Sequence, residues 1–289
     1  HMWGILRRPF FRRAAPGGMM KISVIAATDI GRVRDHNEDD YVALGGNESP
    51  PGVDALLVVA DGMGGHAAGE VASKMTVEGI VRSLNDQREG ASKLEGNALG
   101  AFLAKVLEQV NQEVWQAGQE SDKRGMGTTC TLVAIRGAQL FLAHIGDSRA
   151  YLLREGELHQ ISKDHSWVED AVDQGVITRE QARIHPNRNV ITRAIGLDPQ
   201  PKIDTSSMSF ADGDVLLLCS DGLNSMIPDE DIHRIFTGGG PEEVCQALID
   251  AANNHGGHDN TTVVMAAIGA RRKTPAGIQP SAAELDTQE

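Results

Sequence analysis

The segment ALLVVADG, residues 55–62, is an apolar run that ends in an aspartate and a glycine. Six further runs rich in Val, Ile and Leu lie along the chain; they are ISVIAAT (22–28), TCTLVAIRG (129–137), QLFLAHIG (139–146), RAYLLREG (149–156), DVLLLCS (214–220) and TTVVMAAIG (261–269). Short apolar runs bounded by Gly, Asp or Asn are typical of buried strands. We therefore expect a β structure built as two sheets or as a barrel.

Longer stretches of the chain have helical spacing instead. Apolar residues recur every three or four positions over 68–75, 99–110 and 244–251, and the last stretch follows Pro241, a good first-turn residue. Strand pairs with short turns and only a few long helices do not fit regular βαβ alternation. The expected class is α+β, with antiparallel sheets covered by helices. The polar segment 166–195 is predicted to lie over one edge of the sheets.

Composition narrows the possible functions. The 289 residues include 27 Lys and Arg against 40 Asp and Glu, a net charge of −13, and 40% of the residues are hydrophobic. This balance indicates a soluble protein and argues against nonspecific nucleic-acid binding, which needs clustered Lys and Arg. The odd number of cysteines, Cys130, Cys219 and Cys245, favours reduced thiols in the cytoplasm. No run approaches the ~20 apolar residues of a membrane span.

The two ends of the chain differ from its centre. Residues 1–20 include the basic and aromatic stretch WGILRRPFFRR (3–13), which could lie on an anionic membrane surface. Pro and Gly residues interrupt any helix there, so we favour a disordered basic leader. Residues 271–289 are predicted to be a disordered tail.

Four aspartates occupy equivalent places at strand ends. Asp61 and Asp221 follow apolar runs, Asp147 follows Gly146 at the end of another run, and Asp259 precedes the last run. Strands packed side by side could bring these acids to one edge, where hard cations such as Mg²⁺ or Mn²⁺ would offset their repulsion. Each Asp-Gly pair taken alone fits an ordinary turn, as Asp212-Gly213 does.

The stretch GRVRDHNEDD, residues 31–40, is rich in charge. The planar guanidinium of Arg34 suits a phosphate group, and the nearby acids suit metal-bound water. A solvated surface segment remains the alternative interpretation.

Eight motifs in this order resemble the bacterial form of the type 2C family of metal-dependent protein phosphatases. They are GRVRDHNEDDY (31–41), VVADGMGGHAAGE (58–70), GMGTTCTLVAI (125–135), AHIGDSRAYL (143–152), SKDHS (162–166), HPNRNVITRAIG (185–196), LLLCSDGL (216–223) and GGHDNTTVV (256–264). The resemblance covers residues 21–270, the expected catalytic domain. It implies a four-layer αββα sandwich, two antiparallel β-sheets flanked by helices, with a metal site at one edge.

The resemblance also implies a set of metal ligands. Asp61 would bridge two ions, the Gly62 carbonyl would bind the first, and Asp221 and Asp259 would complete the second. Asp147, together with Asp221, resembles the acids that hold a third ion. Two or three Mn²⁺ or Mg²⁺ ions per chain are therefore expected.

Further roles follow from the same resemblance. Glu38 and Asp39 would act through metal-bound water, Arg34 would bind the substrate phosphate, and residues 166–195 would form a mobile flap. The implied reaction is hydrolysis of phosphoserine and phosphothreonine by metal-activated water. The implied partners are phosphorylated proteins, namely Ser/Thr kinases and their substrates. We expect a cytoplasmic monomer.

One position departs from many eukaryotic members of the family. Met63 stands where they have a histidine proposed as the general acid, and a thioether cannot donate a proton. His66 is a weaker candidate for that role, because it opens an expected helix.

Other interpretations remain open. Cys130 and Arg136 have the C-x5-R spacing of cysteine-dependent phosphatases, but the apolar residues between them predict a strand instead of a phosphate-binding loop. His255 and His258 suggest zinc, although a Gly-rich loop is favoured. The alternative functions are a regulatory pseudophosphatase and a small-molecule phosphatase.

Overall fold

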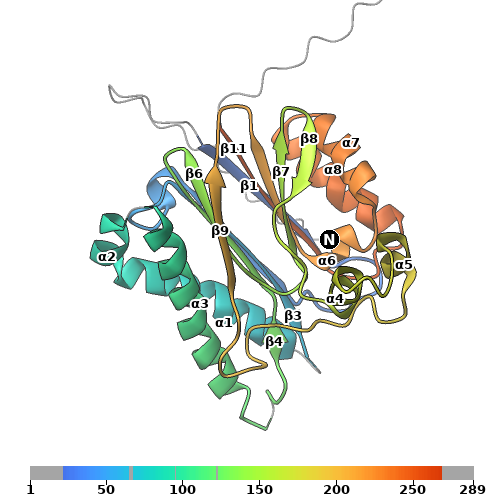
Figure 1. Ribbon diagram of the computed structural model, residues 1–289, viewed down its shortest axis with the longest axis horizontal. Coiled ribbons are helices and arrows are strands. Elements are labelled where there is room, and N and C mark those ends of the chain that lie inside the picture. The colour runs from blue at the N-terminus through green and yellow to red at the C-terminus, as the bar shows by residue number, and fades with distance from the viewer. Residues whose placement is uncertain (1–21, 65–67, 95, 122, 269–289) are drawn as a thin grey trace, which may run out of the picture.

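Two antiparallel sheets form the centre of the computed structural model, which describes residues 22–64, 68–94, 96–121 and 123–268 (Figure 1). The first sheet has the strand order β1 (Ile22–Asp29), β11 (Thr261–Ile268), β10 (Val215–Cys219), β7 (Arg149–Arg154) and β8 (Glu157–Gln160). The second has the order β2 (Asp39–Gly45), β3 (Ala55–Met63), β5 (Cys130–Arg136), β6 (Gln139–Ile145) and β9 (Asp204–Ser209), and β4 (Gly127–Thr128) pairs with β3. The predicted leader, the predicted tail and His66 lie outside the described residues.

Helices cover the outer face of each sheet. On the side of the second sheet lie α1 (Ala68–Asp86), α2 (Arg88–Lys93) and α3 (Asn97–Ala117); on the side of the first lie α6 (Asp221–Asn224), α7 (Asp229–Thr237) and α8 (Pro241–Asn254) (Figure 1). A short 3-10 helix, η1 (Gly46–Glu48), follows β2. The expected four-layer αββα sandwich is therefore confirmed.

The central strands are buried on both faces. In β3, Leu56 and Val58 pack towards the helices α1 and α3, whereas Leu57 and Val59 pack between the two sheets. Successive side chains of a strand point to opposite faces, so a strand between two apolar layers needs an apolar residue at every position. This requirement explains the uninterrupted apolar runs of β3, β10 and β11.

The seven strands predicted from apolar runs are all present, and so are the three predicted long helices. The strands β2, β4, β8 and β9 were missed, as were α2, α4, α6 and α7. These elements are short or lie partly exposed, so they lack the long apolar pattern on which the prediction depended. Within the described chain, no helix combines the length and the apolar character that crossing a bilayer requires.

The segment 166–195, called the flap below, contains α4 (Trp167–Asp173) and α5 (Arg179–Ile184). Its two ends are joined by a β-bridge between Ser166 and Ile191. A capping box begins α5, because Thr178 accepts from the Gln181 amide and the Gln181 side chain accepts from the Thr178 amide. The mobility of the flap stays a prediction.

Candidate active site

Carboxylates from both sheets meet at one rim of the sandwich. Asp39 opens β2 directly opposite Asp61 of β3. Asp221 follows β10 and Asp259 precedes β11, and these two strands pair with each other. Asp147 follows β6 in the turn that leads into β7. We call Asp39, Asp61, Asp147, Asp221 and Asp259 the acidic rim.

The members of the acidic rim lie close enough to change one another's ionisation. Burial, followed by the charges of Asp39 and Asp221, raises the pKa of Asp61 well above its usual value. Burial and the charge of Asp221 do the same for the pKa of Asp147. The pKa of Asp221 rises to about 6, through burial and the charge of Asp259, although a hydrogen bond with Asp61 opposes the rise. Burial and mutual repulsion therefore oppose full ionisation of Asp61, Asp147 and Asp221 when no cation is bound.

Two glycines at the rim are required by close packing. A Cβ atom on Gly62 would lie 2.2 Å from the Gly69 carbonyl oxygen, and one on Gly222 would lie 1.9 Å from the Asn260 carbonyl oxygen. Gly213, by contrast, has φ +88°, and a Cβ atom on it would meet nothing within 4 Å, as expected of a turn glycine. The Asp-Gly pairs of the rim thus differ physically from the Asp212-Gly213 turn.

Asp39 is fixed by hydroxyl groups of the first sheet. Ser220 Oγ and Thr262 Oγ1 both donate to Asp39 Oδ2, each at 2.7 Å. The other oxygen, Oδ1, is buried and has no hydrogen-bond partner within the described residues. Burial raises the pKa of Asp39 to about 7 despite the two hydroxyl donors.

Arg34 lies across the mouth of the rim. Its guanidinium donates to Asp259 Oδ2 at 2.7 Å and lies 4.0 Å from Glu38, and the side chain is 47% exposed. The Arg34 guanidinium thus already lies against Asp259. Because this side chain is partly exposed, it can also contact a ligand that arrives from solvent. Burial comes first among the causes that raise the pKa of Glu38.

Sequence reasoning missed the side chains that hold this rim in place. Asn260 accepts from the Glu38 amide at 2.8 Å and donates to the carbonyls of Ile30 and His36 at 3.0 and 2.9 Å. It therefore fixes the loop that carries Arg34. Asn260 stands next to Asp259 in the motif GGHDNTTVV, but only the folded structure shows what its amide contacts.

Two threonines fix the backbone at Asp61. Thr128 Oγ1 donates to the Asp61 carbonyl at 2.9 Å, and the Asp61 amide donates to Thr129 Oγ1 at 2.9 Å. Thr129 Oγ1 in turn lies 2.7 Å from Ser148 Oγ, beside Asp147. The GMGTTCTLVAI motif therefore supports the carboxylates of both β3 and the β6–β7 turn.

The donor set fits divalent cations. Asp39 Oδ1 and Asp147 Oδ1 are both buried without a hydrogen-bond partner in the described chain, and buried carboxylate oxygens of this kind are costly unless a cation or water contacts them. All the acids of the rim offer hard oxygen ligands, which suit Mg²⁺ and Mn²⁺. Among the described residues, no three acidic, His or Cys side chains are already gathered into a metal-binding group. Cation binding would therefore require rim side chains to move closer together.

The cysteine-phosphatase interpretation is wrong. Cys130 and Arg136 lie at the two ends of β5, and Cys130 is fully buried. Burial raises the pKa of the Cys130 thiol, and Arg136 donates to the backbone carbonyls of Gly52, Ala91 and Leu94 instead of to a ligand. At the candidate zinc site of His255 and His258, the Nδ1 atom of His255 contacts the Ala251 carbonyl at 2.8 Å.

Known proteins are similar to this chain in sequence and in fold. A family model described as Protein phosphatase 2C matches residues 32–263. A serine/threonine phosphatase stp of Listeria monocytogenes is 39% identical over 241 residues, which cover 82% of this chain and 92% of that relative. The solved S. agalactiae serine/threonine phosphatase has a TM-score of 0.78 and 34% identity and covers 86% of this chain and 100% of its own. The catalytic domain of the phosphatase PstP, solved with 2 manganese ions, has a TM-score of 0.72 and 37% identity, covering 87% and 99%.

The fold and the acidic rim together define an αββα phosphatase of the kind that the sequence motifs resemble. The family match extends over most of the chain, and the relatives are covered almost completely. This chain belongs to the protein phosphatase 2C family.

Proposed function

We propose that this protein is a metal-dependent phosphatase that hydrolyses phosphoserine and phosphothreonine in proteins. The observation that carries the proposal is the acidic rim, where carboxylates from both sheets raise one another's pKa and two buried oxygens lack partners among the described residues. Such a site destabilises the folded protein when no cation is bound, because the carboxylates repel one another. With cations bound, the same site can activate water for hydrolysis. Family membership and the manganese bound to the related PstP domain support the same conclusion.

The proposed ligands come from four strand ends, those of β3, β6, β10 and β11. The Asp61 carboxylate and the Gly62 carbonyl would hold the first cation, and Asp61, Asp221 and Asp259 the second. Asp147 would join Asp221 at a third. When bound, the cations would supply an activated water molecule as the nucleophile and neutralise charge on the phosphoryl group.

The remaining residues orient water and substrate. Glu38 and Asp39 accept hydrogen bonds, so their free oxygens would hold the water molecules of the site. Arg34 would turn its guanidinium from Asp259 to the phosphoryl oxygens and hold them with parallel N–H donors. Met63 cannot protonate the leaving serine or threonine oxygen, so that proton would come from water or from another residue.

As part of the same proposal, the enzyme works as a monomer in the cytoplasm and reverses the action of Ser/Thr kinases. The three cysteines are free and buried, which suits a reducing compartment. Its substrates are phosphorylated proteins, as the names of its relatives indicate for those proteins.

The test is hydrolysis of a phosphothreonine peptide with Mn²⁺, with and without a chelator. The wild type is compared with Asp221→Ala and with the matched control Asp212→Ala, which alters an exposed Asp-Gly turn. We expect chelator-sensitive turnover, reduced by more than about 100-fold in Asp221→Ala and retained in Asp212→Ala. Folding of each variant is checked by circular dichroism.

Two results would contradict the proposal. No turnover of any phosphoester by folded wild type would indicate a regulatory pseudophosphatase. Turnover of small phosphorylated metabolites without turnover of peptides would indicate a small-molecule phosphatase.

A further inference from the structure

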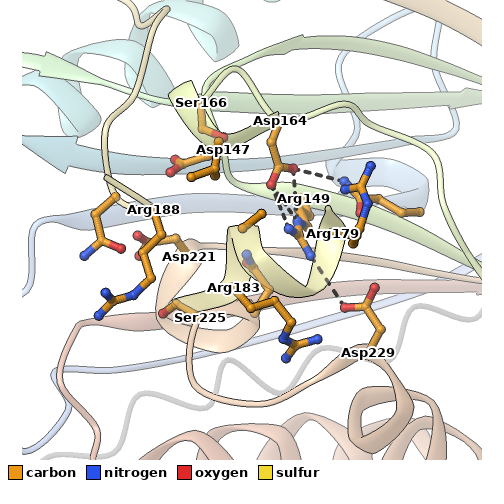
Figure 2. Close-up of a pocket in the computed structure, with 15 residues that line it drawn as sticks. Asp147, Arg149, Asp164, Ser166, Arg179, Arg183, Arg188, Asp221, Ser225 and Asp229 are labelled. Atoms are coloured by element: carbon orange, nitrogen blue, oxygen red, sulfur yellow. Dashed lines mark hydrogen bonds and ion pairs between the residues drawn. The ribbon is translucent and has the colours of Figure 1, made fainter. Parts of the chain in front are cut away.

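A cavity of about 160 Å³ lies between the flap and the acidic rim (Figure 2). Asp147 and Asp221 line it on the side of the rim, and α5 and the residues after it line it on the side of the flap. Four arginines also line this cavity; they are Arg149, Arg179, Arg183 and Arg188. Four aspartates line the cavity as well; they are Asp147, Asp164, Asp221 and Asp229.

Two of the four arginines are already neutralised. Arg149 donates to both oxygens of Asp164, at 2.7 to 3.0 Å, and also reaches Asp229 at 3.5 Å. Arg179 forms a two-pronged ion pair with Glu169, at 2.7 and 3.0 Å. These two ion pairs hold the walls of the cavity in place. The guanidinium groups of Arg149 and Arg179 already donate to protein carboxylates, so they have little capacity left for a ligand.

The other two arginines have no such partner. Within the described residues, neither the Arg183 nor the Arg188 guanidinium makes a hydrogen bond or ion pair. The hydroxyl of Ser225, which lines the same cavity, likewise has no hydrogen-bond partner in the described chain. Arg183, Arg188, Ser225 and Asp221 all line this one cavity (Figure 2). Unused donors therefore line the same cavity as a rim aspartate.

The charge of this cavity depends on the rim. The lining holds four arginines and four aspartates, and two of the aspartates, Asp147 and Asp221, belong to the acidic rim. Divalent cations on Asp147 and Asp221 would offset these two acids and leave the lining with more positive than negative charge. Opposite charge at short range in a partly enclosed site favours an anion. The cavity would then attract an anion when the enzyme is ready to react.

We propose that this cavity is a subsite for an anionic side chain next to the scissile phosphoresidue, held by Arg183, Arg188 and Ser225. The inference rests on the proposed function and adds a substrate class to it: phosphopeptides with a carboxylate or a second phosphate beside the reacting group. Both anions match the guanidinium fork. Neighbouring residues of an extended peptide lie about 3.3 Å apart along the chain, so a peptide whose phosphate is at the rim can reach the adjoining cavity.

The test compares phosphothreonine peptides that differ only in the flanking residues, which are Glu, Gln, Lys or a non-hydrolysable phosphonate. For the wild type with Mn²⁺ we expect kcat/KM to be about tenfold higher with Glu than with Gln, through a lower KM, since a charge-assisted hydrogen bond contributes at that level. A preference for the phosphonate over Glu would identify phosphate as the favoured anion. The reverse order would identify carboxylate.

The variants separate the subsite from general electrostatics. In Arg183→Gln/Arg188→Gln, the ratio between the Glu and Gln peptides is expected to fall towards one. In Arg183→Glu/Arg188→Glu, the preference should turn towards the Lys peptide. Lys105→Gln/Arg124→Gln removes the same two charges from α3 and the loop after it, and it should keep the wild-type ratio.

The remaining results distinguish a failure of the proposed subsite from a failure of the proposed function. Equal efficiency of the wild type with the Glu and Gln peptides, or an unchanged ratio in the charge-reversed variant, would overturn the subsite and leave the phosphatase function standing. No hydrolysis of any peptide by folded wild type would contradict the proposed function, and the subsite would be rejected with it.

Discussion

Gly62 and Gly222 show how single residues build the rim. Each follows a rim aspartate, and each has a backbone carbonyl where a Cβ atom would stand. Because no side chain separates the two backbone segments at each glycine, Asp61 lies against the loop that carries Glu38, and Asp221 lies against Asn260. The glycines therefore determine the spacing between carboxylates that belong to different strands.

This packing predicts different costs for two Asp-Gly pairs. Gly222→Ala places a Cβ atom 1.9 Å from the Asn260 oxygen, so the backbone must move, and we expect a loss of about 3 kcal/mol in the free energy of unfolding. Gly213→Ala meets no atom but keeps φ +88°, which costs about 1 to 2 kcal/mol. Urea denaturation measures both. Equal losses would show that turn conformation, and not close packing, explains Gly222.

At this scale the sequence predicted the rim acids but not their supports. An aspartate after an apolar run is visible in the sequence because its position relative to the strand is local. The contacts of Asn260 with Glu38 and of Thr262 with Asp39 join residues more than 200 positions apart. Nothing in a local pattern encodes such pairs, so they became visible only in the structure.

Elements buried on both faces were predictable, and those at the edges were not. β3, β10 and β11 read as continuous apolar runs because each lies between two hydrophobic layers. β8 and β9 are edge strands with mostly exposed residues, and their sequences ELHQ and DTSSMS resemble loops. Tertiary pairing, not intrinsic preference, makes them strands.

A buried histidine pair connects β6 to the base of the flap. His144 Nε2 lies 3.0 Å from the Lys163 carbonyl, and its Nδ1 lies 3.0 Å from Thr131 Oγ1. The ring of His165 lies 5.0 Å away, and its Nδ1 accepts from the Gly146 amide. A neutral His144 ring can donate to Lys163 and accept from Thr131, so both contacts are satisfied without a charge.

This pair predicts an acid-sensitive element. Burial, followed by the charge of His165, lowers the pKa of His144 from 6.5 to about 4, despite opposing effects of Asp164 and Asp204. The unfolded chain then binds more protons than the folded chain between these values, so stability falls as the pH falls from 6.5 to 4. The contribution is at most about 3 kcal/mol. Urea denaturation across this range should show a shallower pH dependence for His144→Gln than for wild type, while His159→Gln, at an exposed site, should match wild type. Identical profiles for His144→Gln and wild type would contradict the assignment.

At the scale of the whole molecule, the acidic rim lies where the two sheets meet, and both sheets contribute aspartates to it. Asp39 and Asp61 belong to the second sheet, whereas Asp221 and Asp259 adjoin strands of the first. Their mutual repulsion opposes the packing of the two sheets against each other, and the apolar layer between the sheets supports it. A cation bound by aspartates of both sheets would replace this repulsion with an attraction of both sheets to the cation. Activity and stability are therefore expected to respond together to metal.

The last prediction concerns this coupling. At a Mn²⁺ concentration about 100 times its Kd, binding to the folded state adds about 2.7 kcal/mol, equivalent to a rise in Tm of about 5 to 10 °C. Asp221→Asn removes one repelled carboxylate, so in chelator its Tm should exceed that of the wild type, and Mn²⁺ should raise it much less. Thermal unfolding followed by circular dichroism, with Asp212→Asn as control, distinguishes this from a general effect of charge. A wild-type Tm that does not change with Mn²⁺ would show that cations do not connect the sheets, whatever the enzyme does to phosphopeptides.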